Sequence, residues 1–136
     1  MQIDFDEIKR ILAVFIEAPT PFITLKDLDF FSVEGEDADK LVFHLLLLVE
    51  NGLISNCKLE TGNPEFIGLV ITNWNIGGGE IPIRLTQDGH DFASALNQQP
   101  IFERVKKELA EAPFEVVKDV SKRWLGKLMK DKLGLE

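Results

Sequence analysis

The segment at residues 84–96, RLTQDGHDFASAL, constrains the fold more than any other part of the sequence, because its hydrophobic spacing changes from strand-like to helical. The residues just before it, EIPI, are typical of a strand. Thr86 is then placed to accept hydrogen bonds from the first-turn amides of a helix, and Asp88 lies near the positive end of the helix dipole. The positions at helical spacing are Leu85, Gly89, Phe92 and Leu96. The segment therefore predicts a strand that leads directly into a helix.

The same segment contains a histidine and two aspartates, which raises the question of a metal site or an acid–base pair. His90 and Asp91 point away from the apolar stripe of the predicted helix, and no other histidine or cysteine lies within a zinc-like spacing. Gly89 lies on the stripe, where the missing side chain permits close approach of a neighbouring element. We therefore expect a structural role for this segment and no metal site.

Two further helices are expected in the first half of the chain. The first begins after Asp4 as its N-cap and ends before Pro19, with apolar residues at helical spacing between them. The second is expected to begin with Asp37 as its cap and to run to about Glu50, where Asn51 and Gly52 supply a left-handed stop. Both helices are predicted to bury an apolar face.

Short strands are expected between the second helix and residue 86. Residues 53–60 and 65–74 are rich in β-formers and are separated by the turn-like TGNP, while GGG at residues 77–79 predicts a flexible hairpin tip. We expect two or three antiparallel strands. Residues 20–36 are mixed in period, and the sequence leaves open whether they form a short strand or a single helical turn.

The remainder of the chain is expected to be helical and to belong to the same domain. Pro100 and Pro113 are each well placed as the first residue of a new helix. Because there is no internal repeat or long linker, residues 1–136 are predicted to form one domain, with a core at 1–97 and C-terminal helices at 98–136.

The composition favours a soluble, cytoplasmic protein. The single cysteine, Cys57, excludes an internal disulfide, and the opening MQIDFDEIKR lacks the apolar run of a signal peptide. The longest apolar run, at residues 41–49, is interrupted by His44 and is far shorter than the roughly 20 residues that cross a bilayer. We expect no membrane association.

No group of residues predicts catalysis. His44 lies among leucines, where a partly buried histidine with one hydrogen-bond partner is expected, and Cys57 is expected to behave as a small hydrophobe in a strand. GGG precedes Pro82 instead of a helix, so it does not match a phosphate-binding loop. The carboxylates near residue 36 lack the spacing of a calcium loop. We therefore expect no catalytic, cofactor-binding or metal-binding residue and no enzyme activity.

The net charge of −8 is distributed unevenly. Residues 1–85 have 6 basic and 14 acidic side chains, whereas residues 86–136 have 9 of each. Because affinity for nucleic acid depends mainly on neutralising phosphates, the acidic first half argues against nucleic-acid binding by that half.

Three motifs give the chain a family resemblance: HLLLLVENGLI at the end of the second helix, RLTQDGHDF at the junction, and LGL near the C-terminus. With these motifs the chain resembles a bacterial and prophage-borne winged-helix family of unknown function, the domain of unknown function 2513 type. The resemblance implies an α+β winged helix, that is, a helix-turn-helix with a β-hairpin wing, plus a C-terminal helical extension. It implies no catalytic residues. The matching residues are His44, Leu47, Leu48, Glu50, Gly52, Leu53, Ile54, Arg84, Leu85, Thr86, Gly89, His90, Phe92, Leu133, Gly134 and Leu135.

The second helix departs from the family pattern at Leu46, where a polar residue is usual. It is consequently apolar on nearly every side, and such a helix must be enclosed or covered by a partner. It offers no arginine, lysine or amide series for reading a DNA groove. We expect a homodimer or partner interface at Val42, Phe43, Leu46 and Val49, extended by Trp124 and Leu128.

The last helix has an apolar stripe flanked by basic residues. The stripe consists of Val117, Val120, Trp124 and Leu128. The basic residues are Lys118, Lys122, Arg123, Lys127 and Lys130. The simplest interpretation is a helix packed on its own domain or on a second copy, with lysines in water. The alternatives are contact with a nucleic-acid backbone, a membrane surface, or an acidic patch on a partner such as another copy's first half.

These patterns lead to two functional hypotheses. The first is a non-enzymatic winged-helix interaction or regulatory module of phage or bacterial origin, which acts through an unknown protein partner and homodimerisation. The alternative is a DNA-binding transcriptional regulator that uses the wing and the basic C-terminal helix.

Overall fold

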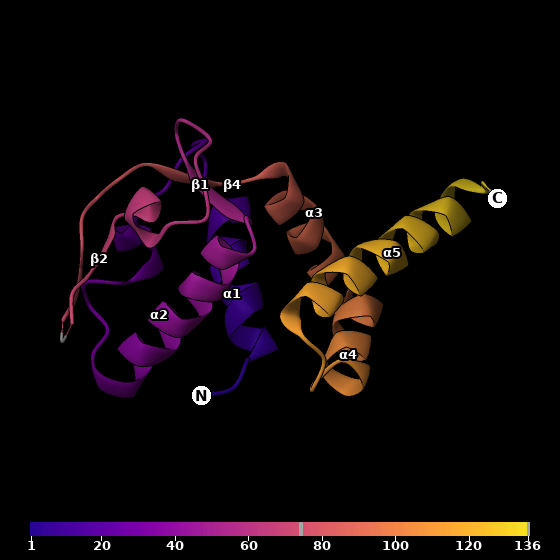
Figure 1. Ribbon diagram of the computed structural model, residues 1–136. Coiled ribbons are helices and arrows are strands. Elements are labelled where there is room, and N and C mark those ends of the chain that lie inside the picture. Colours follow the sequence, from indigo (N-terminus) through magenta and orange to yellow (C-terminus); the bar gives the residue numbers. More distant parts are fainter. Residues whose placement is uncertain (74, 136) are drawn as a thin grey trace. The chain divides into compact units, whose positions relative to one another are not determined.

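The computed structural model describes residues 1–73 and 75–135, so Trp74, the end of a predicted strand run, lies outside the described residues. In these ranges the chain is α+β, with five α-helices and two small antiparallel sheets (Figure 1). It divides into two compact units, Met1–Gly89 and His90–Glu136. A single domain with a division after residue 97 stays a prediction.

Helix α1, Phe5–Glu17, confirms the predicted N-cap. The Asp4 carboxylate accepts hydrogen bonds from the backbone N–H groups of Asp6 and Glu7, at 2.9 and 3.3 Å. These bonds satisfy two of the amides that a helix start leaves without partners. The buried face of the helix comprises Phe5, Glu7, Ile8, Ile11 and Leu12.

Helix α2, Gly35–Glu50, begins earlier than predicted, and Asp37 is not its cap. Glu34 is the N-cap residue and makes no capping hydrogen bond through its side chain, while Asp37 lies within the first turn. A carboxylate in the first turn stabilises a helix through the dipole without capping it, which explains why the cap was predicted three residues too late. Gly52 is left-handed, with φ of 69°, as predicted for the stop.

Residues 20–36 contain both of the structures that the sequence left open. Ile23 forms an antiparallel bridge with Ile83, and its N–H donates to the Ile83 carbonyl at 2.9 Å. The 3₁₀ helix η1, Leu25–Leu28, follows immediately. The mixed period of the sequence therefore reflects two short elements in succession.

Within residues 1–73 and 75–135, four short strands form two sheets, one strand more than the sequence predicted at most. Strands β1, Ile54–Asn56, and β4, Ile83–Leu85, pair antiparallel. Strands β2, Leu69–Ile71, and β3, Ile76–Gly78, form a separate antiparallel pair. A second 3₁₀ helix, η2, Pro64–Ile67, precedes β2.

The GGG segment is not the hairpin tip that the sequence suggested. Gly77 pairs with Val70 and Gly78 with Leu69, so two of the three glycines lie within β3. A Cβ at Gly78 would lie 2.7 Å from Cε1 of Phe30, so a larger residue in this strand would require the Phe30 side chain to shift.

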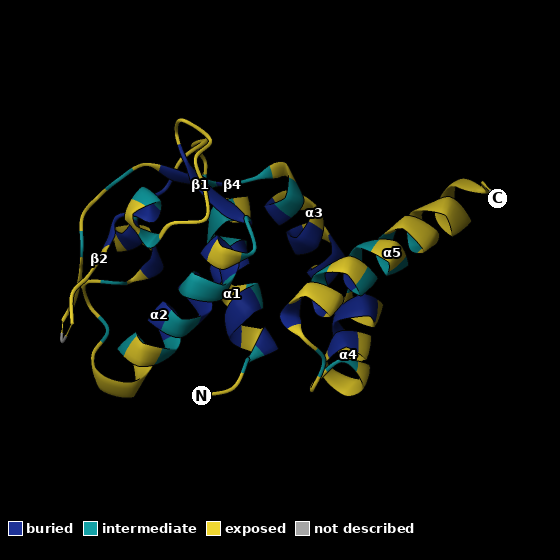
Figure 2. Cartoon of the chain, in the orientation of Figure 1, coloured by how far each residue is buried: buried dark blue, intermediate teal, exposed yellow. Residues whose placement is uncertain are grey.

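The second unit consists mainly of α4, Gln99–Glu108, and α5, Phe114–Leu133, after the end of α3, Gln87–Leu96. Pro100 lies in the first turn of α4, and Pro113 is the N-cap residue of α5, one position before the predicted place. The rings of Phe92 and Phe114 meet edge to face at 5.6 Å. Figure 2 shows burial at the start of α5 and exposure at its far end.

Within the described ranges, none of the helices combines the length and apolar character that crossing a bilayer requires.

Candidate functional site

The strand-to-helix junction joins the end of α2 to the start of α3. The Thr86 hydroxyl accepts from the Gly89 N–H at 3.0 Å and donates to the Gly52 carbonyl at 2.7 Å. The Thr86 N–H donates to the Leu53 carbonyl at 3.0 Å. A side chain at Gly89 would overlap that same carbonyl group. Both predictions for this segment, capping by Thr86 and close approach at Gly89, are confirmed.

His44 is fully buried and has two hydrogen-bond partners, where the sequence suggested one. Its Nδ1 lies 2.7 Å from the Lys40 carbonyl oxygen, to which it donates, and its Nε2 accepts from the Asp4 N–H at 2.9 Å. With both ring nitrogens engaged by the backbone, neither is free to bind a metal or to abstract a proton. His44 therefore connects the start of α1 to α2.

An ion pair lies beside this connection. Lys40 Nζ is 2.6 Å from Asp4 Oδ2. The hydrogen bond from Lys40 lowers the pKa of Asp4 below its usual value, and the same bond raises the pKa of Lys40. The carboxylate of Asp4 is thus shared between capping α1 and pairing with α2.

Cys57 and His90 are the remaining candidates for chemistry. Cys57 is exposed in the turn after β1, which corrects its predicted place as a buried residue in a strand. His90 is exposed near the start of α3. Among the described residues, no three histidine, cysteine, aspartate or glutamate side chains are grouped so that they could bind a metal ion.

The apolar residues of α2 differ in how far the chain covers them. Val42 and Val49 are buried, with 7% and 2% of their surfaces exposed, whereas Phe43 and Leu46 are half-buried. The burial of the two valines explains much of the apolar character that suggested a partner. Of the predicted α2 interface, only Phe43 and Leu46 retain surface for a partner.

A hollow of about 350 Å3 lies beside the start of α2, and the sequence analysis did not predict it. Three segments contribute to it, the loop after η1, the first half of α2 and the β2–β3 hairpin, so no local spacing pattern could reveal it. Its lining residues are Phe30, Val33, Ala38, Asp39, Val42, Asn75 and Ile76. Five of these seven residues are apolar, and Asp39 and Asn75 add polar surface. The exposed carboxylates of Glu34, Glu36 and Asp37 precede or begin the same helix.

The predicted apolar stripe of α5 packs largely within its own unit. Val117 is buried, and Val120, Trp124 and Leu128 are half-buried. The Arg104 guanidinium of α4 lies 3.8 Å from the centre of the Trp124 ring, a cation–π contact. The same arginine pairs with Glu108 at 2.8 Å, and this hydrogen bond lowers the pKa of Glu108.

The basic residues of α5 lie in two environments. Lys118 and Lys122 are half-buried and have interaction partners. Arg123, Lys127 and Lys130 are exposed along the outer part of the helix. The structure therefore does not gather the five predicted basic residues on one uniform surface.

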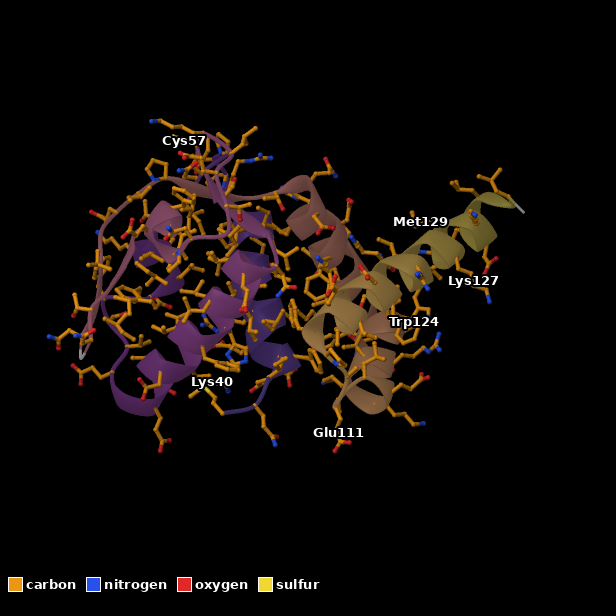
Figure 3. All side chains as sticks on the ribbon, viewed as in Figure 1. Lys40, Cys57, Glu111, Trp124, Lys127 and Met129 are labelled. Carbon is orange, nitrogen blue, oxygen red and sulfur yellow. The ribbon has the colours of Figure 1, made fainter. Side chains whose placement is uncertain are left out.

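The far end of α5 has a second apolar stripe that the sequence analysis did not identify. Leu125, Met129 and Leu133 follow one another at intervals of four residues, and 42% of Met129 and 68% of Leu133 are exposed. Figure 3 shows Met129 and Lys127 on opposite sides of the helix. The four-residue spacing is visible in the sequence, but the sequence analysis considered only the stripe of Val117, Val120, Trp124 and Leu128.

Comparison with known proteins gives a family and no activity. No curated protein and no solved structure matches the chain. The sequence profile of the family described as "Hypothetical protein (DUF2513)" matches residues 2–115, and the chain therefore belongs to this family.

Proposed function

We propose that this chain is a non-enzymatic winged-helix interaction module of phage or bacterial origin that acts in the cytoplasm through protein–protein contacts, including formation of a homodimer. The order of elements in the first unit supports the winged-helix assignment. Helix α1, the Ile23 bridge, η1 and α2 are followed by β1, the segment with β2 and β3, and β4. In this assignment β1, β4 and Ile23 form the small sheet, and residues 57–73 and 75–82 belong to the wing.

The exposed end of α5 is the observation that supports self-association best. Isolated helices shorter than about 12–15 residues are marginal in water, and most helical stability in proteins comes from packing an apolar face. The last two turns of α5 instead present Met129 and Leu133 to solvent. A second protein surface that covers these side chains accounts for both the apolar stripe and the helical order.

Light scattering coupled to size-exclusion chromatography tests this function. The 15.4 kDa chain is expected to give a concentration-dependent mass approaching twice that value. Leu133→Glu is expected to shift the protein to the monomer, and Leu46→Glu measures the contribution of α2. A chain that stays monomeric at the highest attainable concentration would refute the proposal.

The second candidate is a DNA-binding regulator, favoured by the exposed Arg123, Lys127 and Lys130 on α5. Helix α2 occupies the recognition-helix position, yet it begins with carboxylates that repel phosphate. If DNA is bound, affinity should fall steeply with salt and should fall again when Lys122, Arg123 and Lys127 are neutralised. Absence of binding to duplex DNA at low salt would exclude this candidate.

A further inference from the structure

The exposed end of α5 is a positively charged apolar ridge, here called the tail ridge. It consists of Leu125, Met129 and Leu133, and on the helix Lys132 and Lys130 border it on either side. Among the described residues, neither lysine forms an ion pair. A helix that presents side chains at i, i+4 and i+8 with a basic border is suited to an apolar groove with an acidic rim.

The hollow beside the start of α2, here called the acidic groove, has the complementary character. Its walls include Val33, Val42 and Ile76, and the Ile76 side chain is itself exposed. Asp39 lies in its lining, and Glu36 lies three residues earlier on the same helix. Its volume of about 350 Å3 falls within the range of about 300–1,000 Å3 that is usual for binding pockets.

The nearby lysine does not neutralise this acidic rim. Lys40 pairs with Asp4 at 2.6 Å, on the side of α2 that faces α1. Among the described residues, Glu36 and Asp39 form no ion pair. The groove therefore keeps negative charge for a basic partner.

Charge decides which occupant fits the tail ridge. A second tail ridge would bring the lysines of two helices together, where like charges repel, and a duplex or another polyanion would match the lysines but would offer no apolar surface to the ridge. A second copy of this chain offers apolar walls and opposite charge together. We propose that the tail ridge of one copy docks in the acidic groove of a second copy, so that the dimer forms through unlike surfaces.

This inference rests on the proposed function, since it names the surfaces through which the copies associate. Two such contacts related by a two-fold axis close a dimer, whereas one contact repeated in a single direction extends into an oligomer. The full chain is therefore expected to show either a dimer or a concentration-dependent series. Because the tail ridge and the acidic groove are different surfaces, we expect that substitutions in either one alone weaken the contact.

Paired charge reversal tests the contact. The tail variant contains Lys130→Glu with Lys132→Glu, and the groove variant contains Glu36→Lys with Asp39→Lys. Each variant alone is expected to have a self-association constant at least about tenfold weaker, because several attractive charge pairs become repulsive. An equimolar mixture of the two variants should recover association, since each then offers the charge that the other needs.

Two matched controls separate local from general charge effects. Lys127→Glu makes the same change on the opposite side of α5 (Figure 3). Glu50→Lys makes the same change at the other end of α2. Both are expected to leave association unchanged. Circular dichroism of every variant verifies that the helices are intact.

Each remaining outcome contradicts the inference. If the wild-type chain is monomeric, both the contact and the proposed function fail. If it associates but the groove variant associates equally well, self-association stands and the ridge-to-groove contact fails. If monomers bind vesicles of phosphatidylcholine and phosphatidylserine, or duplex DNA, through the tail ridge, its occupant is a lipid or a nucleic acid instead of a second copy.

Discussion

Replacement of Gly89 by alanine isolates the contact on which the junction depends. A Cβ at this position would overlap the Leu53 carbonyl oxygen and would lie 3.1 Å from its carbonyl carbon and 3.3 Å from Leu85 Cβ. These neighbours are backbone or Cβ atoms, so no side-chain rotation relieves the overlap. The same carbonyl oxygen accepts the hydrogen bond from the Thr86 N–H, so a shift of the carbonyl also weakens the junction.

Opposing contributions set the expected change in unfolding free energy. Alanine in place of glycine stabilises a compatible site by about 0.4–1 kcal/mol through the unfolded state. Extra volume in a tightly packed place destabilises by about 1–3 kcal/mol, and weakening of one hydrogen bond adds about 1 kcal/mol. The overlap is therefore the larger effect, and Gly89→Ala should destabilise the protein by about 1–3 kcal/mol.

Urea and thermal denaturation followed by far-ultraviolet circular dichroism measure this change. Gly126→Ala is the matched control, because a Cβ there meets no atom within 4 Å and Gly126 lies inside α5. The control should gain about 0.5–1 kcal/mol of stability. A loss of 1 kcal/mol should lower the melting temperature by about 3–6 °C. If Gly89→Ala is as stable as the wild type, the close approach does not control the junction.

Three other predictions concern the hydrogen bonds of the first unit. Asp4→Asn keeps the cap but removes the ion pair. Because the pKa of Asp4 is lowered in the folded state, the contribution of the Asp4 carboxylate to stability is complete above the usual pKa of 3.8 and is lost as the pH falls through the lower folded-state pKa. The free energy of unfolding, measured by urea denaturation between about pH 5 and pH 2, should therefore vary less with pH in Asp4→Asn than in the wild type. The difference should be at most about 1 kcal/mol, because the ion pair is exposed. His44→Leu should destabilise by about 1–3 kcal/mol in the same assay, since the Asp4 N–H loses its acceptor; equal stability would show that water replaces the ring. Thr86→Val should lose about 1–2 kcal/mol and Thr86→Ser much less, and equal losses would exclude the hydroxyl as the cause.

The sequence predicted those parts of the fold that depend on neighbouring residues. Capping by Asp4 and Thr86 requires only a side-chain oxygen two or three residues before an N–H, and the stop at Gly52 requires only left-handed backbone. Gly89 was interpreted correctly because its place on the apolar stripe made a close approach the simplest explanation. Such local rules are visible without knowing which segments meet.

Two of the features that the sequence analysis predicted wrongly or missed depend on contacts between residues distant in sequence, and the third, the cap of α2, depends on residue types that a cap and a first turn share. GGG was taken for a hairpin tip because glycine usually marks a turn, whereas Gly77 and Gly78 pair within β3 and Gly78 packs against the ring of Phe30, far from it in sequence. Asp37 was taken for a cap because the dipole favours the same residue types in the first turn. The acidic groove joins three segments, so periodicity within one segment could not reveal it.

Because the charge of the chain is uneven, the strength of self-association should depend on salt. The direction of this dependence distinguishes a dimer formed through like surfaces from one formed through oppositely charged surfaces. Residues 1–85 have eight more acidic than basic side chains, while residues 118–132 have six basic and two acidic ones. Two copies that meet through like acidic surfaces repel, and salt would screen that repulsion and strengthen the dimer. Contact between the tail ridge and the acidic groove brings opposite charges together, so salt should weaken it. Sedimentation equilibrium at low and high salt measures this sign, and tighter association at high salt would rule out unlike surfaces as the basis of the dimer.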